Sequence, residues 1–79
     1  INNQMFTDYK SKLQEYFMQK FNELPEYSVE KEEGIEHKKI FYINVVFRKK
    51  IYGSGSGKNK KEAAQDAALN ALRALGNLQ

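Results

Sequence analysis

Three lysines separate a glycine-rich segment from an alanine-rich one. Residues 53–57 read Gly-Ser-Gly-Ser-Gly, and residues 63–68 contain four alanines. The lysines between these segments are Lys58, Lys60 and Lys61. Asn59 is a good helix N-cap, and the side chain of Glu62 can reach back to the Asn59 backbone N–H. We therefore expect a helix that begins near Lys60 and carries two lysines in its first turn.

Lysines in the first turn of a helix act against the helix itself. The free N–H groups and the helix dipole make this end positive, so each cation costs roughly 0.3–1 kcal/mol, whereas an anion is stabilised. Lys60 and Lys61, with Lys58 just outside the helix, therefore indicate a site for an external anion, for which phosphate is the best candidate. The alternative is a solvated charged face without a ligand.

The same segment does not match the common nucleotide-binding motifs. A Walker A loop would need glycine at position 52 and serine or threonine at 59, where this chain has Tyr52 and Asn59. The dinucleotide fingerprint fails because its third glycine, Gly57, comes one residue early. His37 has no Ser or Cys partner at a recognisable spacing, so we interpret it as a loop donor to a nucleic acid and not as a catalytic base.

The composition is that of one small, basic domain. Of the 79 residues, 41% are hydrophobic and 13% aromatic, and the net charge is +3. This is enough for a core and for a mild attraction to polyanions, but it leaves little room for a catalytic cavity. With no cysteine and one histidine, we expect no disulfide, no zinc and no other cofactor, and a reducing, cytoplasmic environment. No apolar run could span a bilayer, and the chain begins at Ile1, so we expect a domain of a longer protein.

A period of three to four residues predicts a first amphipathic helix, capped by Thr7 or Asp8 and stopped by Pro25. Its inner face would hold Tyr9, Leu13, Tyr16, Phe17, Lys20, Phe21 and Leu24. Its outer face would hold Ser11, Gln14, Glu15 and Met18. An ordinary wet surface is the default interpretation of that outer face, although Gln14 and Glu15 can bond to hydroxyl groups.

A period of two predicts three strands, at residues 27–33, 39–47 and 51–56. In the first strand, Tyr27, Val29 and Lys31 would share one face. In the second, we take Phe41 as the main core anchor, and the turn that follows would be Arg48, Lys49 and Lys50. In the third, the glycines at 53, 55 and 57 share one face and leave it flat, so something can approach the backbone closely.

A final helix would pack small residues against the sheet and end at Gly76 as a C-cap. Its inner face would hold Ala64, Ala67, Ala68, Ala71, Leu72 and Leu75. The domain would therefore run over residues 8–76, with tails at 1–7 and 77–79.

The predicted order α-β-β-β-α defines an α+β fold. Its short connections require a three-stranded antiparallel meander with both helices on one face. Because the strands alternate in direction, the loop at 34–38 and the helix start at 58–61 should lie at the same end as neighbours. The first half of the first helix points to that end as well, so three polar sites would share one surface.

Short motifs along the whole chain add a resemblance to a known family. They are Asp8-Tyr9-Lys10, Leu13-Gln14-Glu15, Pro25-Glu26-Tyr27, Glu32-Glu33-Gly34, His37-Lys38-Lys39, Phe41, Gly57-Lys58 and Lys60-Lys61-Glu62-Ala63. In these residues the segment from about Asp8 to Leu75 resembles a double-stranded RNA-binding domain, and more narrowly the C-terminal one of bacterial ribonuclease III.

The resemblance implies three groups of RNA-binding residues. Ser11, Gln14 and Glu15 would touch ribose hydroxyls in one minor groove. The loop that contains Gly34, Ile35, His37 and Lys38 would enter the next minor groove. Phosphates across the intervening major groove would be bound by Lys58, Lys60 and Lys61, with Asn59 as the cap. Two residues depart from the family pattern: Ile35 replaces a common proline, which would loosen the loop, and Asn59 replaces a common serine but keeps the capping role.

We therefore expect this chain to bind double-stranded RNA by its A-form shape, with little sequence specificity, as the substrate-binding domain of a ribonuclease III. It would carry no catalytic residue, and a parent homodimer would form through another domain. The alternative is a protein-interaction or dimerisation module of the same fold that does not bind RNA, which would not need three lysines at the helix start. A KH-type binder of single strands would need a Gly-x-x-Gly loop between helices, which is absent.

Overall fold

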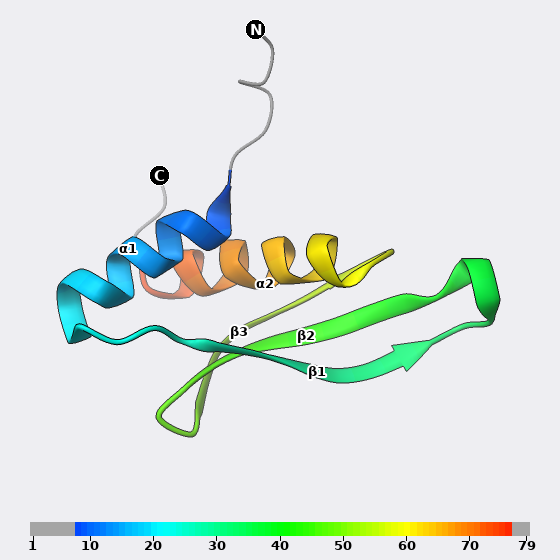
Figure 1. Cartoon of the computed structure of the whole chain (residues 1–79), viewed down its shortest axis with the longest axis horizontal. Coiled ribbons are helices and arrows are strands. Elements are labelled where there is room, and N and C mark those ends of the chain that lie inside the picture. Colours follow the sequence, from blue (N-terminus) through cyan, green and yellow to red (C-terminus); the bar gives the residue numbers. More distant parts are fainter. Residues whose placement is uncertain (1–7, 77–79) are drawn as a thin grey trace, which may run out of the picture.

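The computed structural model describes residues 8–76 and has the predicted order of helices and strands. Its elements are α1 (Tyr9–Phe21), β1 (Glu26–Glu33), the short 3₁₀ helix η2 (Glu36–Lys38), β2 (Ile40–Phe47), β3 (Lys50–Gly57) and α2 (Lys60–Ala74). The strands form one antiparallel sheet in the order β1-β2-β3, and both helices cover the same face of it (Figure 1). The predicted α+β fold is confirmed. The predicted tails, at 1–7 and 77–79, lie outside the described residues.

A β-bulge in β1 changes which residues face the helices. Val29 pairs with the buried Ile43, whereas Lys31 pairs with Tyr42, so the register shifts at Glu30. Side chains alternate between the two faces of a strand, and directly paired residues share a face. Lys31 therefore lies on the face away from the helices. Its predicted grouping with Val29 is wrong, because a strict period of two does not allow for the extra residue of a bulge.

The turn between β2 and β3 uses two residues with positive φ. Arg48 has φ 52° and Lys49 has φ 67°, as expected for a two-residue hairpin turn whose central residues are both left-handed. Lys50, which was predicted to lie in the turn, is the first residue of β3 and pairs with Phe47. Residues other than glycine rarely adopt positive φ. Contacts of the Arg48 guanidinium offset part of this cost, because it lies 5.4 Å from the ring centroid of Phe21 and 4.9 Å from that of Phe47.

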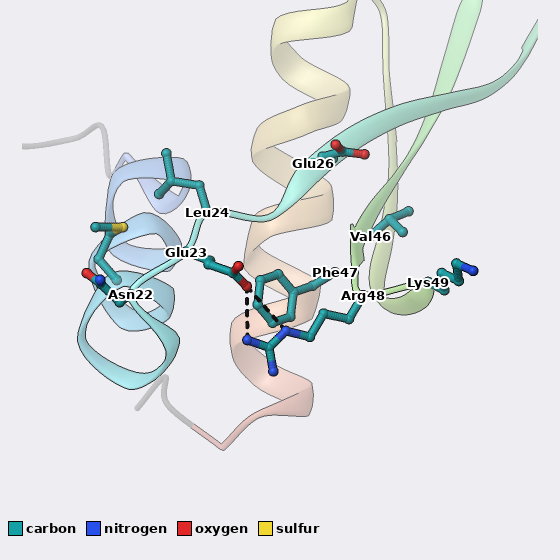
Figure 2. Close-up of a pocket in the computed structure, with 9 residues that line it drawn as sticks. Asn22, Glu23, Leu24, Glu26, Val46, Phe47, Arg48 and Lys49 are labelled. Atoms are coloured by element: carbon teal, nitrogen blue, oxygen red, sulfur yellow. Dashed lines mark hydrogen bonds and ion pairs between the residues drawn. The ribbon is translucent and has the colours of Figure 1, made fainter.

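Helix α1 ends earlier than predicted. Asn22 adopts a left-handed conformation, and its N–H donates to the Met18 carbonyl at 2.9 Å, so the helix stops before Pro25 is reached. Beyond this cap, Glu23 Oε1 accepts hydrogen bonds from Arg48 Nε at 3.2 Å and Nη2 at 3.0 Å, as Figure 2 shows. This ion pair joins the end of α1 to the turn between β2 and β3.

The core lies between the helices and the sheet, and Phe17 is its largest fully buried side chain. The Phe17 ring centroid is 4.8 Å from that of Phe47 and 5.4 Å from that of Tyr52. Tyr52 takes part because a second bulge shifts the register of β3 at this residue. Phe41 is only partly buried against this cluster, so its predicted role as the main anchor is wrong. Periodicity indicates the face that a residue occupies but not its distance from the centre of the core.

Small residues on both sides let α2 lie directly on β3. The buried residues of α2 are Ala63, Ala64, Ala67, Ala68, Ala71 and Leu72. A Cβ atom on Gly53 would lie 2.5 Å from the Ala71 nitrogen, and one on Gly57 would lie 2.6 Å from the Ala63 nitrogen. These separations are too short for real Cβ atoms. The flat glycine face predicted from the sequence is therefore covered by α2.

Two side chains of α2 also bond to the free edge of β3. Asp66 Oδ2 accepts a hydrogen bond from the Ser56 N–H at 3.0 Å, and Asn70 Nδ2 donates to the Ser54 carbonyl at 2.6 Å. Unpaired groups on an edge strand invite pairing with another chain. The helix therefore protects the edge as well as the face of β3.

Between residues 8 and 76, neither helix is long and apolar enough to cross a membrane.

Gly55→Ala should lower the free energy of unfolding by about 3 kcal/mol, in the upper part of the range for overpacked cores. The new methyl group would overlap the backbone nitrogen of Ala67, and backbone atoms cannot rotate away as a side chain can. Urea denaturation measures the change. Ser56→Ala is the matched control, because this side chain lies exposed on the same strand, and it should change stability by less than about 0.5 kcal/mol. Equal stability of the two variants would contradict the close contact.

Candidate nucleic-acid interface

The start of α2 is capped as predicted, with one difference. Asn59 Oδ1 accepts the Glu62 N–H at 2.8 Å, so the helix begins at Lys60. The Glu62 carboxylate reaches back to the N–H of Lys58 at 3.2 Å, where the Asn59 N–H was expected. This bond holds the residue before the cap and so connects the end of β3 to the first turn of α2.

The three lysines at this helix start are exposed. Among the ion pairs of residues 8–76, none involves Lys58, Lys60 or Lys61. The first turn of α2 thus combines free backbone N–H groups, the positive end of the dipole and uncompensated cations. This arrangement can bind an anion such as a phosphate group.

The outer face of α1 is exposed at Ser11, Gln14 and Glu15, as predicted. These three residues line one shallow hollow together with Met18 and Leu24, whose side chains are also exposed. The face can both donate and accept hydrogen bonds. Leu24 gives it an apolar margin, and its predicted place on the inner face of the helix is wrong because α1 ends at Phe21 and Leu24 is exposed.

The loop between β1 and β2 has a constrained backbone. Gly34 has φ +100°, and a Cβ atom there would overlap the Lys38 carbonyl oxygen, so only glycine fits. The turn closes through a 2.8 Å hydrogen bond from the Lys38 N–H to the Ile35 carbonyl. Ile35 is 76% exposed, and the His37 side chain is 94% exposed with its Nε2 3.7 Å from Glu36 Oε1. The residues that were predicted to enter a groove are therefore presented to solvent.

The three regions lie in series along the domain. Gly57 at the end of β3 pairs with Phe41 near the start of β2, so the α2 start and the β1–β2 loop leave the same end of the sheet. In Figure 1 the start of α2 lies between the start of α1 and that loop. The prediction that the loop and the α2 start lie at the same end of the sheet is confirmed, whereas the start of α1 lies farther from the loop along the domain (Figure 1). The loop and the α2 start are, however, not joined by a hydrogen bond or ion pair among residues 8–76.

A polar tie between the two helices was not predicted. The Tyr9 N–H donates to Gln65 Oε1 at 2.8 Å, and Gln65 Nε2 donates to Asp8 Oδ1 at 2.8 Å. The predicted capping role of Asp8 is confirmed, because its carboxylate accepts the Ser11 N–H at 3.2 Å and the Ser11 hydroxyl at 2.8 Å. Gln65 follows Asp8 by 57 residues, so no local sequence pattern could have connected them.

The tie changes the acidity of Asp8. Hydrogen bonds from Gln65, and then from Ser11, hold the pKa of the Asp8 carboxyl below its usual value of 3.8. A carboxyl whose pKa is lower in the folded state contributes stability above its unfolded-state pKa. That contribution is lost as the pH falls through the folded-state pKa.

Within residues 8–76, no cluster of three or more His, Cys, Asp or Glu side chains could hold a metal ion.

Comparison with known proteins identifies the family. The family model described as "Double-stranded RNA binding motif" matches residues 9–75. Ribonuclease 3 of Clostridium beijerinckii is 45% identical over 75 residues, which are 95% of this chain and 32% of that protein. Ribonuclease 3 of Borreliella burgdorferi is 42% identical over 73 residues, which are 92% of this chain and 30% of that protein. The chain thus spans about a third of the length of these relatives.

A solved structure supports the same assignment. The structure of Arabidopsis HYL1, which has implications for miRNA processing, aligns with a TM-score of 0.73 and 40% identity, covering 89% of this chain and 99% of that one. This chain belongs to the double-stranded RNA-binding domain family. Over residues 9–75 it matches the model of that family.

Asp8→Asn should lower the melting temperature at neutral pH, because it removes the carboxylate that Gln65 and Ser11 stabilise. The difference from the unsubstituted protein should shrink as the pH falls below 3.8 and be smallest below the lower folded-state pKa, where Asp8 is protonated in both states. Melting curves between pH 2 and 7 measure it. Glu33, whose pKa is lowered by Lys31 and Tyr42, titrates in both proteins and cancels in the difference. A difference that does not depend on pH would contradict the assignment to Asp8.

Proposed function

We propose that this domain binds double-stranded RNA by shape, with little dependence on sequence. The major groove of an A-form helix is too narrow to read, whereas its wide minor groove displays 2′-hydroxyl groups. The observation that supports this best is the serial arrangement of an exposed polar face, a lysine-rich helix start and an exposed loop along the domain (Figure 1). Such a series suits minor groove, major groove and minor groove on one side of a duplex.

Each region then has a separate role. Ser11, Gln14 and Glu15 bond to ribose hydroxyls in one minor groove, and the loop of Gly34, Ile35, His37 and Lys38 enters the next. Phosphates between the two grooves are bound by Lys58, Lys60 and Lys61, with Asn59 holding the helix start. Lysines supply most of the affinity, and the hydroxyl contacts supply the preference for RNA over DNA. The exposed Ile35 gives the loop an apolar tip where the family more commonly has proline.

We also propose that the domain delivers duplex RNA to a ribonuclease III in the cytoplasm. The support is its similarity to two bacterial proteins named Ribonuclease 3, each about three times as long as the matched segment. Cleavage would belong to a different part of such a parent, and so would any contact that makes the parent a homodimer. The lysines at the start of α2 are exposed and have no ion-pair partner among residues 8–76. This argues against the alternative of a same-fold protein-interaction module, because a dimerisation surface does not require such lysines.

One titration separates these possibilities. The domain should bind duplex RNA more tightly than duplex DNA or single-stranded RNA at the same salt concentration. Replacing Gln14 and Glu15 together by alanine should weaken RNA binding by about 1–3 kcal/mol, the value of one or two partly charge-assisted hydrogen bonds. DNA binding should stay level or rise slightly, because DNA lacks the hydroxyl and the change removes a negative charge. If the ratio of the RNA affinity to the DNA affinity is unaltered, Gln14 and Glu15 are ordinary surface residues of the helix and do not contact the ribose hydroxyls.

Lys60→Ala and Lys61→Ala should each weaken duplex RNA binding and leave the fold intact. Each should also lower the slope of log K against log salt by roughly 0.7–0.9, the effect of one lost phosphate contact. Arg73→Ala is the control, because this substitution removes one positive charge from the last turn of the same helix. If both lysine variants keep the slope of the Arg73 variant, the start of α2 does not bind phosphate.

A further inference from the structure

Helix α1 contributes apolar side chains to the core along its length, among them the buried Leu13, and Tyr9 packs against that core. Towards its C-terminal end, the rings of Phe17 and Phe21 pack on Phe47, with centroid separations of 4.8 and 4.9 Å. Towards its N-terminal end, the side chain of Gln65 accepts a hydrogen bond from the Tyr9 N–H and donates one to Asp8. The C-terminal end of α1 is therefore fixed by apolar packing, whereas the N-terminal end is positioned by apolar packing and, in addition, by this one polar side chain.

Gln65 lies between the two surfaces assigned to RNA. On the α1 side, the Asp8 oxygen that accepts from Gln65 also accepts the N–H of Ser11. On the α2 side, Gln65 comes one turn after Lys61, and both line the same hollow with Tyr9. One side chain therefore connects the start of the minor-groove face to the start of the phosphate-binding helix.

A small rotation of α1 moves its N-terminal residues by a distance that can be estimated. Ser11 precedes Phe17 by six residues, about 9 Å along the axis at a rise of 1.5 Å per residue. A swing of about 10° around Phe17 would move Ser11 by roughly 1.5 Å, which exceeds the tolerance of about 0.5 Å for a preorganised site. A small change of helix orientation is therefore enough to break hydroxyl contacts in one groove while phosphates stay bound in the next.

We propose that Gln65 is a positioning residue for duplex RNA. It does not touch the RNA; it fixes the first half of α1 relative to the start of α2, so that Gln14, Glu15 and the lysines engage neighbouring grooves at once. This inference rests on the proposed function. Without the tie, binding must first order α1, and that cost lowers the affinity.

Double-mutant cycles of duplex RNA affinity test the proposal. Gln65→Ala should weaken binding about three- to tenfold, as expected for the loss of one or two hydrogen bonds. In the Gln65→Ala background, the further loss caused by replacing Gln14 and Glu15 should shrink by a similar factor, because those contacts are already impaired. The loss caused by Lys60→Ala should keep its full size, since α2 does not depend on the tie.

Asn70→Ala is the matched control for a general structural effect. Asn70 is also a half-buried polar residue of α2 with a tertiary hydrogen bond, but it bonds to the Ser54 carbonyl of β3 and not to α1. It should leave RNA affinity nearly unchanged well below its melting temperature. The positioning role would be overturned if the loss of RNA affinity caused by replacing Gln14 and Glu15 were the same with and without Gln65→Ala. It would also be overturned if Asn70→Ala lowered the affinity as much as Gln65→Ala does.

A swap of the two partners provides a rescue. Gln65→Glu brings a second carboxylate to the position 2.8 Å from Asp8 Oδ1 and should weaken binding at least as much as Gln65→Ala. Adding Asp8→Asn restores an N–H donor between the two side chains, and the carboxylate introduced by Gln65→Glu can still accept the Tyr9 N–H. The double substitution should therefore recover part of the affinity. No recovery would contradict the tie.

A measurement without RNA separates this proposal from the proposed function. Residual dipolar couplings of the backbone amides report the orientation of α1 relative to α2. Gln65→Ala should change that orientation or reduce the order of the first half of α1, and Asn70→Ala should not. If the unsubstituted domain fails to bind duplex RNA, the proposed function falls. An unchanged α1 in Gln65→Ala overturns the positioning role whatever the RNA result.

Discussion

The close contact of α2 with β3 is the constraint on which the rest of this small domain depends. Glycines 53, 55 and 57 present bare backbone to the alanines at 63, 67 and 71, and a single added Cβ would collide with the helix backbone. The same approach brings Asp66 and Asn70 within bonding distance of the edge of β3. In a chain of 79 residues, which has little apolar surface to bury, this contact also fixes the position of the α2 start relative to the sheet.

Helix α1 depends on that arrangement but is attached differently. Its aromatic face meets Phe47 and Tyr52, and the bulge in β3 is needed for Tyr52 to take part. Packing of this kind is strong and poorly directional, because dispersion and burial depend on contact area. The hydrogen bonds of Gln65 are weaker but sensitive to distance and angle. The helix therefore gains its stability mainly from the apolar contacts and part of its precise orientation from the polar ones.

Paired and unpaired charges lie in different parts of the domain. Two glutamates of β1 and one of the α1–β1 connection have basic partners: Glu33 is 3.1 Å from Lys31, Glu32 is 3.3 Å from Lys39 and Glu23 is 3.0 Å from Arg48. These exposed pairs add little stability, but they compensate the negative charge away from the α2 start. The lysines at 58, 60 and 61 keep their charge uncompensated within the described residues. These three lysines therefore keep their positive charge where a phosphate backbone would lie in the proposed complex.

Local signals in the sequence determined the elements, their order and the exposed candidate residues. The cap at Asn59, the order of the helices and strands and the flat glycine face depend on neighbours within a few positions, and all are present in the structure. Two β-bulges were missed because periodicity assumes an unbroken register, and Phe41 was overrated because a period does not report depth in the core. Only the tertiary structure brought Gln65 to Asp8 and Asn70 to Ser54. Such contacts join residues that lie far apart along the chain, and their geometry exists only after the helices have packed on the sheet.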